Sequence, residues 1–257
     1  MGDFRADEDI RAESGLHRAG ACPFDMCDGT GFVEDEATRT ASDCRCRRGR
    51  IASTRAARLE GRIPRRYRGV SFDRPPVSDI ARTAPDQIRA VRRYIGSIEE
   101  NLDAGNGLWI QGDVGTGKTT LAMLISKAAL DASRSVAIYS LPRLLNLLRE
   151  SMDSDGGMLD FMDRLTAVDL LHIDDLGAEH QTEWVLEQLY SIVNARYEAE
   201  RAIVATTNLM PDELSDRLGP RTVSRLVEIC GDLIPLFGQD NRREFRAERS
   251  VGATRED

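Results

Sequence analysis

Residues 112–119 read GDVGTGKT, and this stretch decides the fold. It fits the pattern G-x-x-x-x-G-K-[ST], follows a short apolar run, and precedes a helical pattern that begins at Thr119. Such a loop lets backbone N–H groups point at phosphate oxygens, and the helix N-terminus adds partial positive charge. We expect Lys118 to reach the β- and γ-phosphates of ATP and the Thr119 hydroxyl to bind Mg²⁺. The predicted nucleotide-binding residues here are Gly112, Asp113, Val114, Gly115, Thr116, Gly117, Lys118, Thr119 and Thr120.

Around this loop, apolar runs alternate with helical patterns. The apolar runs lie at residues 108–110, 136–139, 168–173 and 202–205. Helical patterns cover residues 118–132, 141–151 and 182–200, and an amphipathic pattern over 85–105 comes before the first run. Buried strands that alternate with helices indicate a parallel sheet covered on both faces. The sequence therefore predicts a three-layer α/β fold.

Two carboxylates end the apolar run at 168–173. Asp174 and Asp175 stand where a Walker B element is expected, after a buried strand that follows the phosphate loop. We expect Asp174 to hold Mg²⁺, directly or through water, and Asp175 to orient the attacking water. His172 lies within the same run, and we expect it to be a packed residue of the strand.

Three polar residues further along the chain complete the predicted catalytic set. Asn208 follows the next apolar run, where its amide could sense the γ-phosphate or the attacking water; the alternative is a turn-forming residue. Arg221 and Arg225 are four residues apart, on one face of a short helix. We expect Arg225 to act on a neighbouring subunit's γ-phosphate as an arginine finger. Arg221 either contacts the same phosphate or braces the interface.

Four of the five cysteines lie close together in the sequence. Disulfides do not persist in a reducing cytosol, so metal binding is the better interpretation of the cluster, against free thiols. Four thiolates can complete a tetrahedral Zn²⁺ site, in which His17, Asp25 or Asp28 could replace one cysteine. The fifth cysteine, Cys230, is expected to be a buried small hydrophobe. The predicted zinc ligands are Cys22, Cys27, Cys44 and Cys46.

Charge is distributed unevenly along the chain, although the net charge is −8. Residues 1–36 carry ten acidic side chains and three arginines, whereas residues 39–74 carry twelve arginines and three acidic side chains. The basic stretch could meet phosphate or an acidic partner, or it could be a solvated connector. We predict four parts: an acidic tail and cysteine-rich segment at 1–48, a basic linker at 49–84, an ATPase domain at 85–240 and a charged tail at 241–257.

The sequence contains no apolar stretch of the roughly 20 residues that a membrane-spanning helix needs. The acidic first ten residues have no signal-peptide core. We therefore expect a cytoplasmic protein without a membrane partner.

The motifs together resemble the AAA+ ATPases of the replicative helicase loader family (DnaC/DnaI type) and the related IstB-type transposition helpers. The matching stretches are GDVGTGKTTLA, DLLHIDDLGAE, TEWVLEQLYSIVNARY, ATTNL and LGPRTVSRLVE, and the match covers about residues 60–240. The resemblance implies five parallel strands in the order 5-1-4-3-2 and no helical lid. One branch of loaders also carries CPxCxGTG followed by CxC. Here the first pair is C-x4-C, which departs from that pattern by two residues.

The resemblance also implies a function. It implies slow ATP hydrolysis stimulated by single-stranded DNA or assembly, loading of a DnaB-type helicase onto single-stranded DNA, and self-association through the ATP sites. The implied cofactors are ATP, Mg²⁺ and Zn²⁺. A DNA-contacting insert is expected at about residues 141–165, where Arg143, Arg149 and Arg164 could follow phosphates and Phe161 could stack on a base. The alternative, which we favour for any single one of these residues, is an ordinary amphipathic helix pair with its apolar face in the core.

Two other functions compete with the loader. The first, from the same superfamily, is an ATPase helper that regulates DNA transposition. The second is from another class: a zinc-bearing adaptor that uses ATP as a switch and hardly turns over. Pull-down of a helicase or a transposase separates the first two, and a turnover assay with single-stranded DNA separates both from the third.

Overall fold

The computed structural model describes residues 63–152, 156–178 and 181–238, together with Cys22, 26–27, 30, 32–35, 40–44 and 46–47 near the N-terminus. The chain divides into two compact units, Met1–Ile51 and Ala52–Asp257. Residues 1–21 of the predicted N-terminal segment 1–48, the predicted tail at 241–257, and the alternative ligands His17, Asp25 and Asp28 lie outside the described residues.

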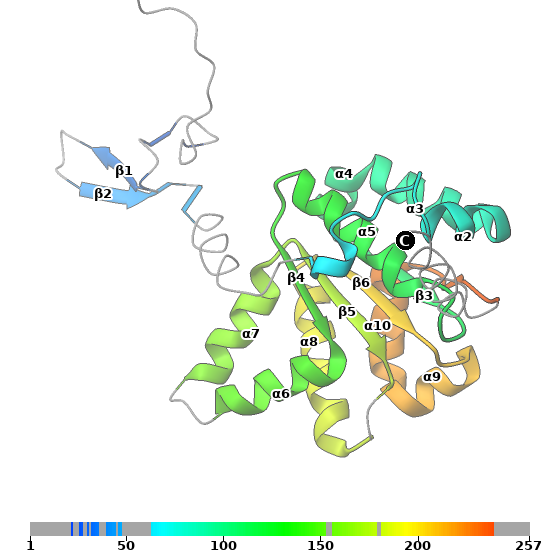
Figure 1. Ribbon diagram of the computed structural model, residues 1–257. Coiled ribbons are helices and arrows are strands. Elements are labelled where there is room, and N and C mark those ends of the chain that lie inside the picture. Colours follow the sequence, from blue (N-terminus) through cyan, green and yellow to red (C-terminus); the bar gives the residue numbers. More distant parts are fainter. Residues whose placement is uncertain are drawn as a thin grey trace, which may run out of the picture. The chain divides into compact units, whose positions relative to one another are not determined.

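The larger unit is built on a sheet of five parallel strands (Figure 1). The strands are β3 (Leu108–Gln111), β4 (Val136–Ser140), β5 (Leu170–Leu176), β6 (Ala202–Thr207) and β7 (Ile234–Pro235). Their order across the sheet is β4-β5-β6-β3-β7. Counted along the chain with β3 as the first strand, this is the implied 5-1-4-3-2 order. The details differ at one edge, where β7 is two residues long and pairs through Ile110 and Gln111 alone.

Helices cover both faces of this sheet (Figure 1). One face packs against α2 to α5, around buried residues such as Ile110 and Leu121. The other face packs against α6 to α10, around Trp109 and its neighbours. The helices are α2 (Val77–Thr83), α3 (Pro85–Gly96), α4 (Ile98–Asp103), α5 (Lys118–Asp131), α6 (Leu141–Met152), α7 (Gly157–Ala167), α8 (Glu183–Glu198), α9 (Pro211–Leu218) and α10 (Pro220–Cys230). Adjacent residues of β3 thus point into different cores, which gives the predicted three layers.

The predicted helix over residues 85–105 is two helices. Ser97 has φ −119° and ψ 39°, outside the helical region, and it separates α3 from α4. The apolar spacing continues across the break, with Val91, Ile98 and Leu102 all buried, so periodicity alone predicted one element.

The end of the predicted linker belongs to the folded body. Residues 63–84 form the 3-10 helix η1 (Arg65–Tyr67) and α2, and Val77 and Ile80 are buried in the same core as α5. This stretch has the composition of a linker because it contains the two arginines of η1 together with Pro64, Pro75 and Pro76. Its few apolar residues are nevertheless enough to pack it against the core.

After α10 the described chain, residues 231–238, contains β7. Across the described residues, every helix is too short or too polar to span a bilayer.

Candidate functional site

The phosphate loop joins β3 to α5, as predicted. Gly117 has φ +105° and is the N-cap of α5. A Cβ at Gly117 would lie 2.3 Å from Ile80 Cδ1, so only glycine fits between the loop and α2. At the other end of the loop, a Cβ on Gly112 would lie 1.9 Å from the carbonyl oxygen of Leu236. Glycine at these two positions lets the loop pass between two packed segments.

Lys118 is folded into the loop. Lys118 is 5% exposed, and its ammonium group donates a hydrogen bond to the Asp113 carbonyl oxygen at 2.7 Å. The Thr116 hydroxyl donates to the same oxygen at 2.9 Å. Val114, in contrast, is 56% exposed on the outside of the loop, and Thr120 is buried in the first turn of α5. Lys118 therefore places its positive charge inside the loop, where a phosphate is expected to bind.

Asp174 of β5 lies beside Thr119 of α5. The Thr119 hydroxyl is 2.9 Å from Asp174 Oδ1 and 3.2 Å from Oδ2. Thr206 of β6, which the sequence analysis did not single out, donates its hydroxyl to Asp174 Oδ1 at 2.7 Å. The two predicted Mg²⁺ ligands are thus adjacent. A carboxylate and a hydroxyl at this spacing are the oxygen donors that Mg²⁺ takes from protein when it keeps waters and phosphate oxygens as its other ligands.

Asp175 lies in a bulge of the sheet. The register shifts between Ile173 and Leu176, so that Asp174 and Asp175 together oppose Thr206. Asp175 has φ +58°, which is uncommon for a residue other than glycine. Its backbone N–H donates to the Thr206 hydroxyl at 2.9 Å instead of to a carbonyl of β6. The bulge turns the chain at the carboxylate that was predicted to orient water.

Asn208 follows the last residue of β6 and is exposed. The loop that carries it is tied to β3, because the buried Gln111 donates its Nε2 to the Leu209 carbonyl oxygen at 2.9 Å. The Thr207 hydroxyl accepts from Leu209 N at 3.1 Å and donates to the Leu176 carbonyl oxygen at 2.9 Å. Gln111 was missed by the sequence analysis because it falls inside the strand before the phosphate loop.

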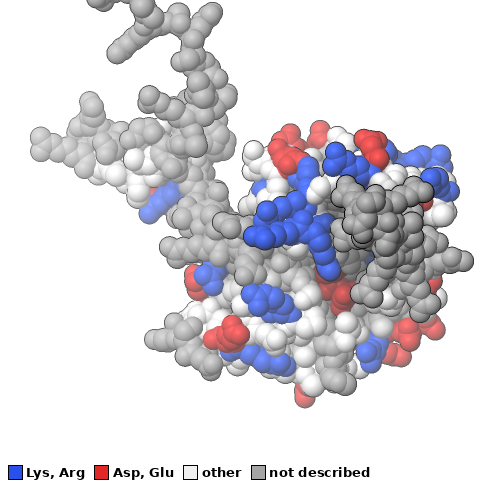
Figure 2. All heavy atoms as spheres, in the orientation of Figure 1, with Lys and Arg blue, Asp and Glu red and all other residues white. Residues whose placement is uncertain are grey.

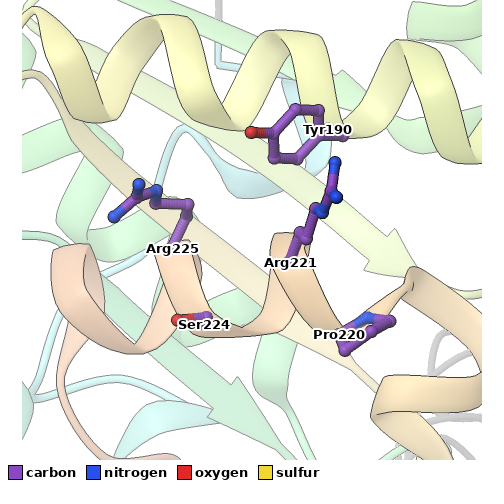
Figure 3. A pocket seen from close by; sticks show the side chains of 5 residues that line it. All are labelled: Tyr190, Pro220, Arg221, Ser224 and Arg225. Atoms are coloured by element: carbon purple, nitrogen blue, oxygen red, sulfur yellow. The ribbon is translucent and has the colours of Figure 1, made fainter.

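Arg221 and Arg225 line an open pocket of about 440 Å³ between α8 and α10, with Tyr190, Pro220 and Ser224 (Figure 3). Arg225 Nη1 donates to the two carboxylate oxygens of Glu228 at 3.0 and 3.2 Å. The Arg225 guanidinium also stacks on the Tyr197 ring, 4.0 Å from its centroid. These partners of Arg225 lie on α8 and α10. The geometry agrees with the prediction that both arginines lie on one helix face.

His172 is a packed strand residue, as expected. It is fully buried, and its Nδ1 lies 2.9 Å from the Ser126 hydroxyl, which donates to the Ala122 carbonyl oxygen. Since the single hydroxyl proton is used there, His172 Nδ1 is the donor to Ser126. Its Nε2 is buried without a hydrogen-bond partner, and burial lowers the pKa of His172 to about 4. The ring is therefore neutral at physiological pH.

The predicted zinc ligands come together in the smaller unit. Strands β1 (Phe32–Asp35) and β2 (Thr40–Asp43) form an antiparallel hairpin between the two pairs of cysteines. The four Sγ atoms lie within 4.8 Å of one another, with Cys22–Cys44 at 3.7 Å and Cys27–Cys46 at 3.5 Å. Tetrahedral zinc with bonds of about 2.3 Å requires S···S distances of about 3.8 Å, so the four thiols fit this ion. The C-x4-C spacing is therefore compatible with a four-cysteine cluster that could hold Zn²⁺.

The expected DNA-contacting insert is the helix pair α6 and α7. Phe161 is 6% exposed and packs in the core, as the alternative of an ordinary amphipathic helix pair predicts, so it does not offer its ring to a base. Arg164 pairs with Asp160 at 3.3 Å. Arg149 stacks on the Trp184 ring at 4.5 Å. The apolar residues of α6 and α7, which recur with helical spacing, thus face the core of the domain.

Comparison with known proteins agrees with this geometry. The family model "IstB-like ATP binding protein" matches residues 95–227. The replicative helicase loader DnaI of Bacillus subtilis is 26% identical over 147 residues, which are 57% of this chain and 46% of DnaI. The replicative helicase loader DnaC of Escherichia coli is 26% identical over 153 residues, 59% of this chain and 61% of DnaC. This chain thus matches about half to three-fifths of these two relatives.

Solved structures of DNA-replication proteins have a fold similar to that of this chain. The crystal structure of the DnaC helicase loader has a TM-score of 0.57 at 25% identity, and it covers 67% of this chain and 99% of that chain. The AMPPCP-bound DnaA of Aquifex aeolicus has a TM-score of 0.56 at 23% identity over 73% of this chain and 56% of that chain, which supports the fold. Since the family model spans more than half of its length, this chain belongs to the IstB-like ATP-binding family of AAA+ P-loop proteins.

Proposed function

We propose that this protein is an ATPase that loads a DnaB-type replicative helicase onto single-stranded DNA. The observation that carries the proposal is the 2.9 Å contact between Thr119 of the phosphate loop and Asp174 of the Walker B strand. It brings the donors for Mg²⁺ and the lysine for the phosphates into one site, in a family whose named relatives include two replicative helicase loaders.

The proposed division of labour in hydrolysis follows the chemistry of each group. Lys118 would neutralise charge on the β- and γ-phosphates of ATP, and Thr119 and Asp174 would hold Mg²⁺, which would supply further positive charge there. Asp175 accepts a hydrogen bond from the attacking water and aligns it. Asn208, at the end of the neighbouring strand, donates its amide to the γ-phosphate or to that water. Because Mg²⁺ stabilises phosphate charge when bound, the remaining requirement is a cation on the far side of the γ-phosphate.

We assign that cation to Arg225 of an adjacent subunit. Its present partners, Glu228 and Tyr197, are in its own subunit and belong to α10 and α8. The exposed pair with Glu228 contributes about 1 kcal/mol or less, so it can exchange for a phosphate. Arg221 lines the same pocket and is the second candidate (Figure 3). Hydrolysis is then slow in single subunits and faster when they assemble on single-stranded DNA.

The N-terminal unit is the proposed helicase-binding part, with Zn²⁺ bound by Cys22, Cys27, Cys44 and Cys46. In the ATPase unit, exposed arginines gather at η1, where Figure 2 shows a group of basic side chains. Arg65, Arg66 and Arg68 are all exposed there. We assign these arginines to contact with nucleic-acid phosphate, which would make DNA binding strongly salt-dependent.

A reconstituted loading assay tests the function. The full chain is mixed with a DnaB-type helicase, ATP and a single-stranded DNA covered by its binding protein, and unwinding of an adjacent duplex is measured. We expect unwinding to depend on this protein. Asp175→Asn should still bind ATP but hydrolyse it far more slowly. Equal unwinding with and without the protein would contradict the loader function.

One observation favours the transposition helper as second candidate: the matching family model is the IstB-like one. A parallel pull-down with the transposase of an insertion element decides between them. Retention of transposase and not helicase would replace the loader by the helper. Binding of helicase with no ATP turnover on single-stranded DNA would instead indicate the zinc-bearing adaptor.

A further inference from the structure

Thr206 lies opposite the bulge that carries both Walker B carboxylates. In a regular parallel ladder, each residue of β5 would face one residue of β6. Here Asp174 and Asp175 face Thr206 together. Bulges of this two-against-one kind re-aim side chains and are frequent beside active sites. What replaces the lost ladder contact is the Thr206 side chain.

The Thr206 hydroxyl makes one hydrogen bond to each of the two residues. It donates to Asp174 Oδ1 at 2.7 Å and accepts from Asp175 N at 2.9 Å. Thr206 is 0% exposed, so solvent cannot take over either bond. One hydroxyl thus fixes the carboxylate direction of Asp174 and the backbone of Asp175 at its unusual φ of +58°.

Thr119 also contacts Asp174, but the two threonines do different work. A Thr119 hydroxyl that ligates Mg²⁺ must turn a lone pair toward the metal. Thr206 approaches Asp174 from β6, and its bonds need no change when Mg²⁺ and ATP bind. A fixed hydrogen bond to a carboxylate ligand orients it for the metal, and its loss elsewhere lowers metal affinity by about 10- to 100-fold.

We infer that Thr206 is the positioning residue of the Walker B pair: it aims Asp174 at Mg²⁺ and holds Asp175 in the bulge. The inference rests on the proposed binding of Mg²⁺ and ATP at this site. It also explains why a threonine at the end of β6 has a role separate from that of Asn208, two residues later.

The experiment compares wild type with Thr206→Val, which keeps the shape and removes the hydroxyl, and with Thr206→Ser, which keeps the hydroxyl. The matched control is Thr222→Val, at a threonine of α10 that is 1% exposed. The affinity for a non-hydrolysable ATP analogue is measured with and without Mg²⁺ on the full chain. A second measurement, without nucleotide, is hydrogen exchange at the Asp175 amide.

For Thr206→Val we expect the gain in affinity from Mg²⁺ to fall at least about tenfold, with Mg²⁺-free affinity unchanged, and the Asp175 amide to exchange faster. Thr206→Ser and Thr222→Val should behave like wild type in both measurements. Wild-type values for Thr206→Val, or loss of the Mg²⁺ effect in Thr206→Ser, would overturn the inference while leaving the proposed function intact. A wild-type protein with no Mg²⁺ effect would overturn both, and should Thr206→Val not fold, Thr206→Ala, which also lacks the hydroxyl, takes its place in both measurements.

Discussion

A lysine that is 5% exposed, as Lys118 is, is uncommon because an ammonium group taken from water needs strong compensation. For Lys118, the hydrogen bond from its ammonium group to the Asp113 carbonyl oxygen, at 2.7 Å, supplies part of this compensation. A phosphate supplies more, since it adds full negative charge. The side chain is therefore held where binding of an anion is favourable.

We expect Lys118→Ala to lower ATP affinity at least about 100-fold without unfolding the chain, because a charge-assisted contact to phosphate is lost and little core packing is involved. Equilibrium binding of a fluorescent ATP analogue measures it. The matched control is Lys127→Ala, because Lys127 is the other lysine of the chain and pairs with Asp131 on the surface of α5. Equal affinity in wild type and Lys118→Ala would remove the phosphate-loop assignment.

His172 gives the fold a dependence on pH. Burial lowers the pKa of His172 from 6.5 to about 4, so the folded protein favours the neutral form of the ring. Between these two values the unfolded chain binds a proton that the folded chain does not. The contribution of the neutral His172 ring to the free energy of unfolding is therefore fully present above pH 6.5. It decreases by up to about 3 kcal/mol as the pH falls toward 4.

The expected measurement is the free energy of unfolding in urea from pH 7.5 to pH 5. In wild type it should decrease through this window, and in His172→Leu the decrease should be smaller, whatever the absolute stability of the variant. His180→Gln serves as a control for another histidine. The same slope in wild type and His172→Leu would show that His172 does not control the decrease.

At the scale of elements, Arg196 joins four segments. This residue of α8 is fully buried, and its guanidinium donates to four carbonyl oxygens, at 2.5 to 3.2 Å. The carbonyls belong to Leu165 in α7, Val168 and Asp169 before β5, and Ala202 at the start of β6. Burial lowers the pKa of Arg196 to about 9, still high enough for a charged side chain at neutral pH.

We expect Arg196→Met to lower the free energy of unfolding by about 3 kcal/mol or more, because it leaves four carbonyl oxygens, three of them in buried contacts, without this donor. Urea unfolding at pH 7.5 measures the change. Arg201→Met is the control, since Arg201 is partly exposed and pairs with Asp169 at 3.1 Å, and its loss should cost about 1 kcal/mol or less. Equal losses in the two variants would contradict the proposed importance of the buried guanidinium.

For the hairpin unit we expect one Zn²⁺ per chain. Units as small as Met1–Ile51 commonly need a metal or disulfides for stability, and the buried side chains among its described residues are Cys22, Cys44 and Cys46. Elemental analysis after gel filtration measures the metal, and Cys44→Ser with Cys46→Ser should remove it. Cys230→Ser is the control and should keep it. Metal-free protein with four titratable thiols and an unchanged hairpin would contradict the zinc site.

The elements differ in how well the sequence predicted them. Contiguous motifs were sufficient to predict the strand, loop and helix around Lys118 and the position of Asp174 and Asp175 near the end of β5, because these features depend on neighbours in the chain. Thr206 and Gln111 were missed because their roles come from neighbouring strands and a bulge that no local pattern reveals. The break at Ser97 was missed because buried residues keep a helical spacing across it.

At the scale of the whole molecule, the proposed site is incomplete in one subunit, because Arg225 faces its own Tyr197 and Glu228. We expect Arg225→Ala to bind ATP normally and to hydrolyse it up to about 1,000-fold more slowly under assembling conditions. Arg82→Ala, at an exposed arginine of α2, is the control and should not differ from wild type.

Mixing two inactive variants tests whether Arg225 acts between subunits. Lys118→Ala supplies the arginine without a working pocket, and Arg225→Ala supplies the pocket without the arginine. With single-stranded DNA or helicase present, the mixture should regain part of the hydrolysis. No recovery would mean that Arg225 acts in its own subunit or has no catalytic role, and wild-type turnover of Arg225→Ala would transfer the assignment to Arg221.

The buried position of Lys118 has a practical consequence for labelling. Apart from the amino terminus, the chain offers amine-reactive reagents two lysines, and Lys127 is the accessible one. Of the two lysines, a dye coupled under mild conditions therefore reacts mainly with Lys127 of α5, nearly three turns from the phosphate loop, while Lys118 reacts far more slowly. The slow residual acylation of Lys118, followed by mass spectrometry, then reports directly whether ATP occupies the loop.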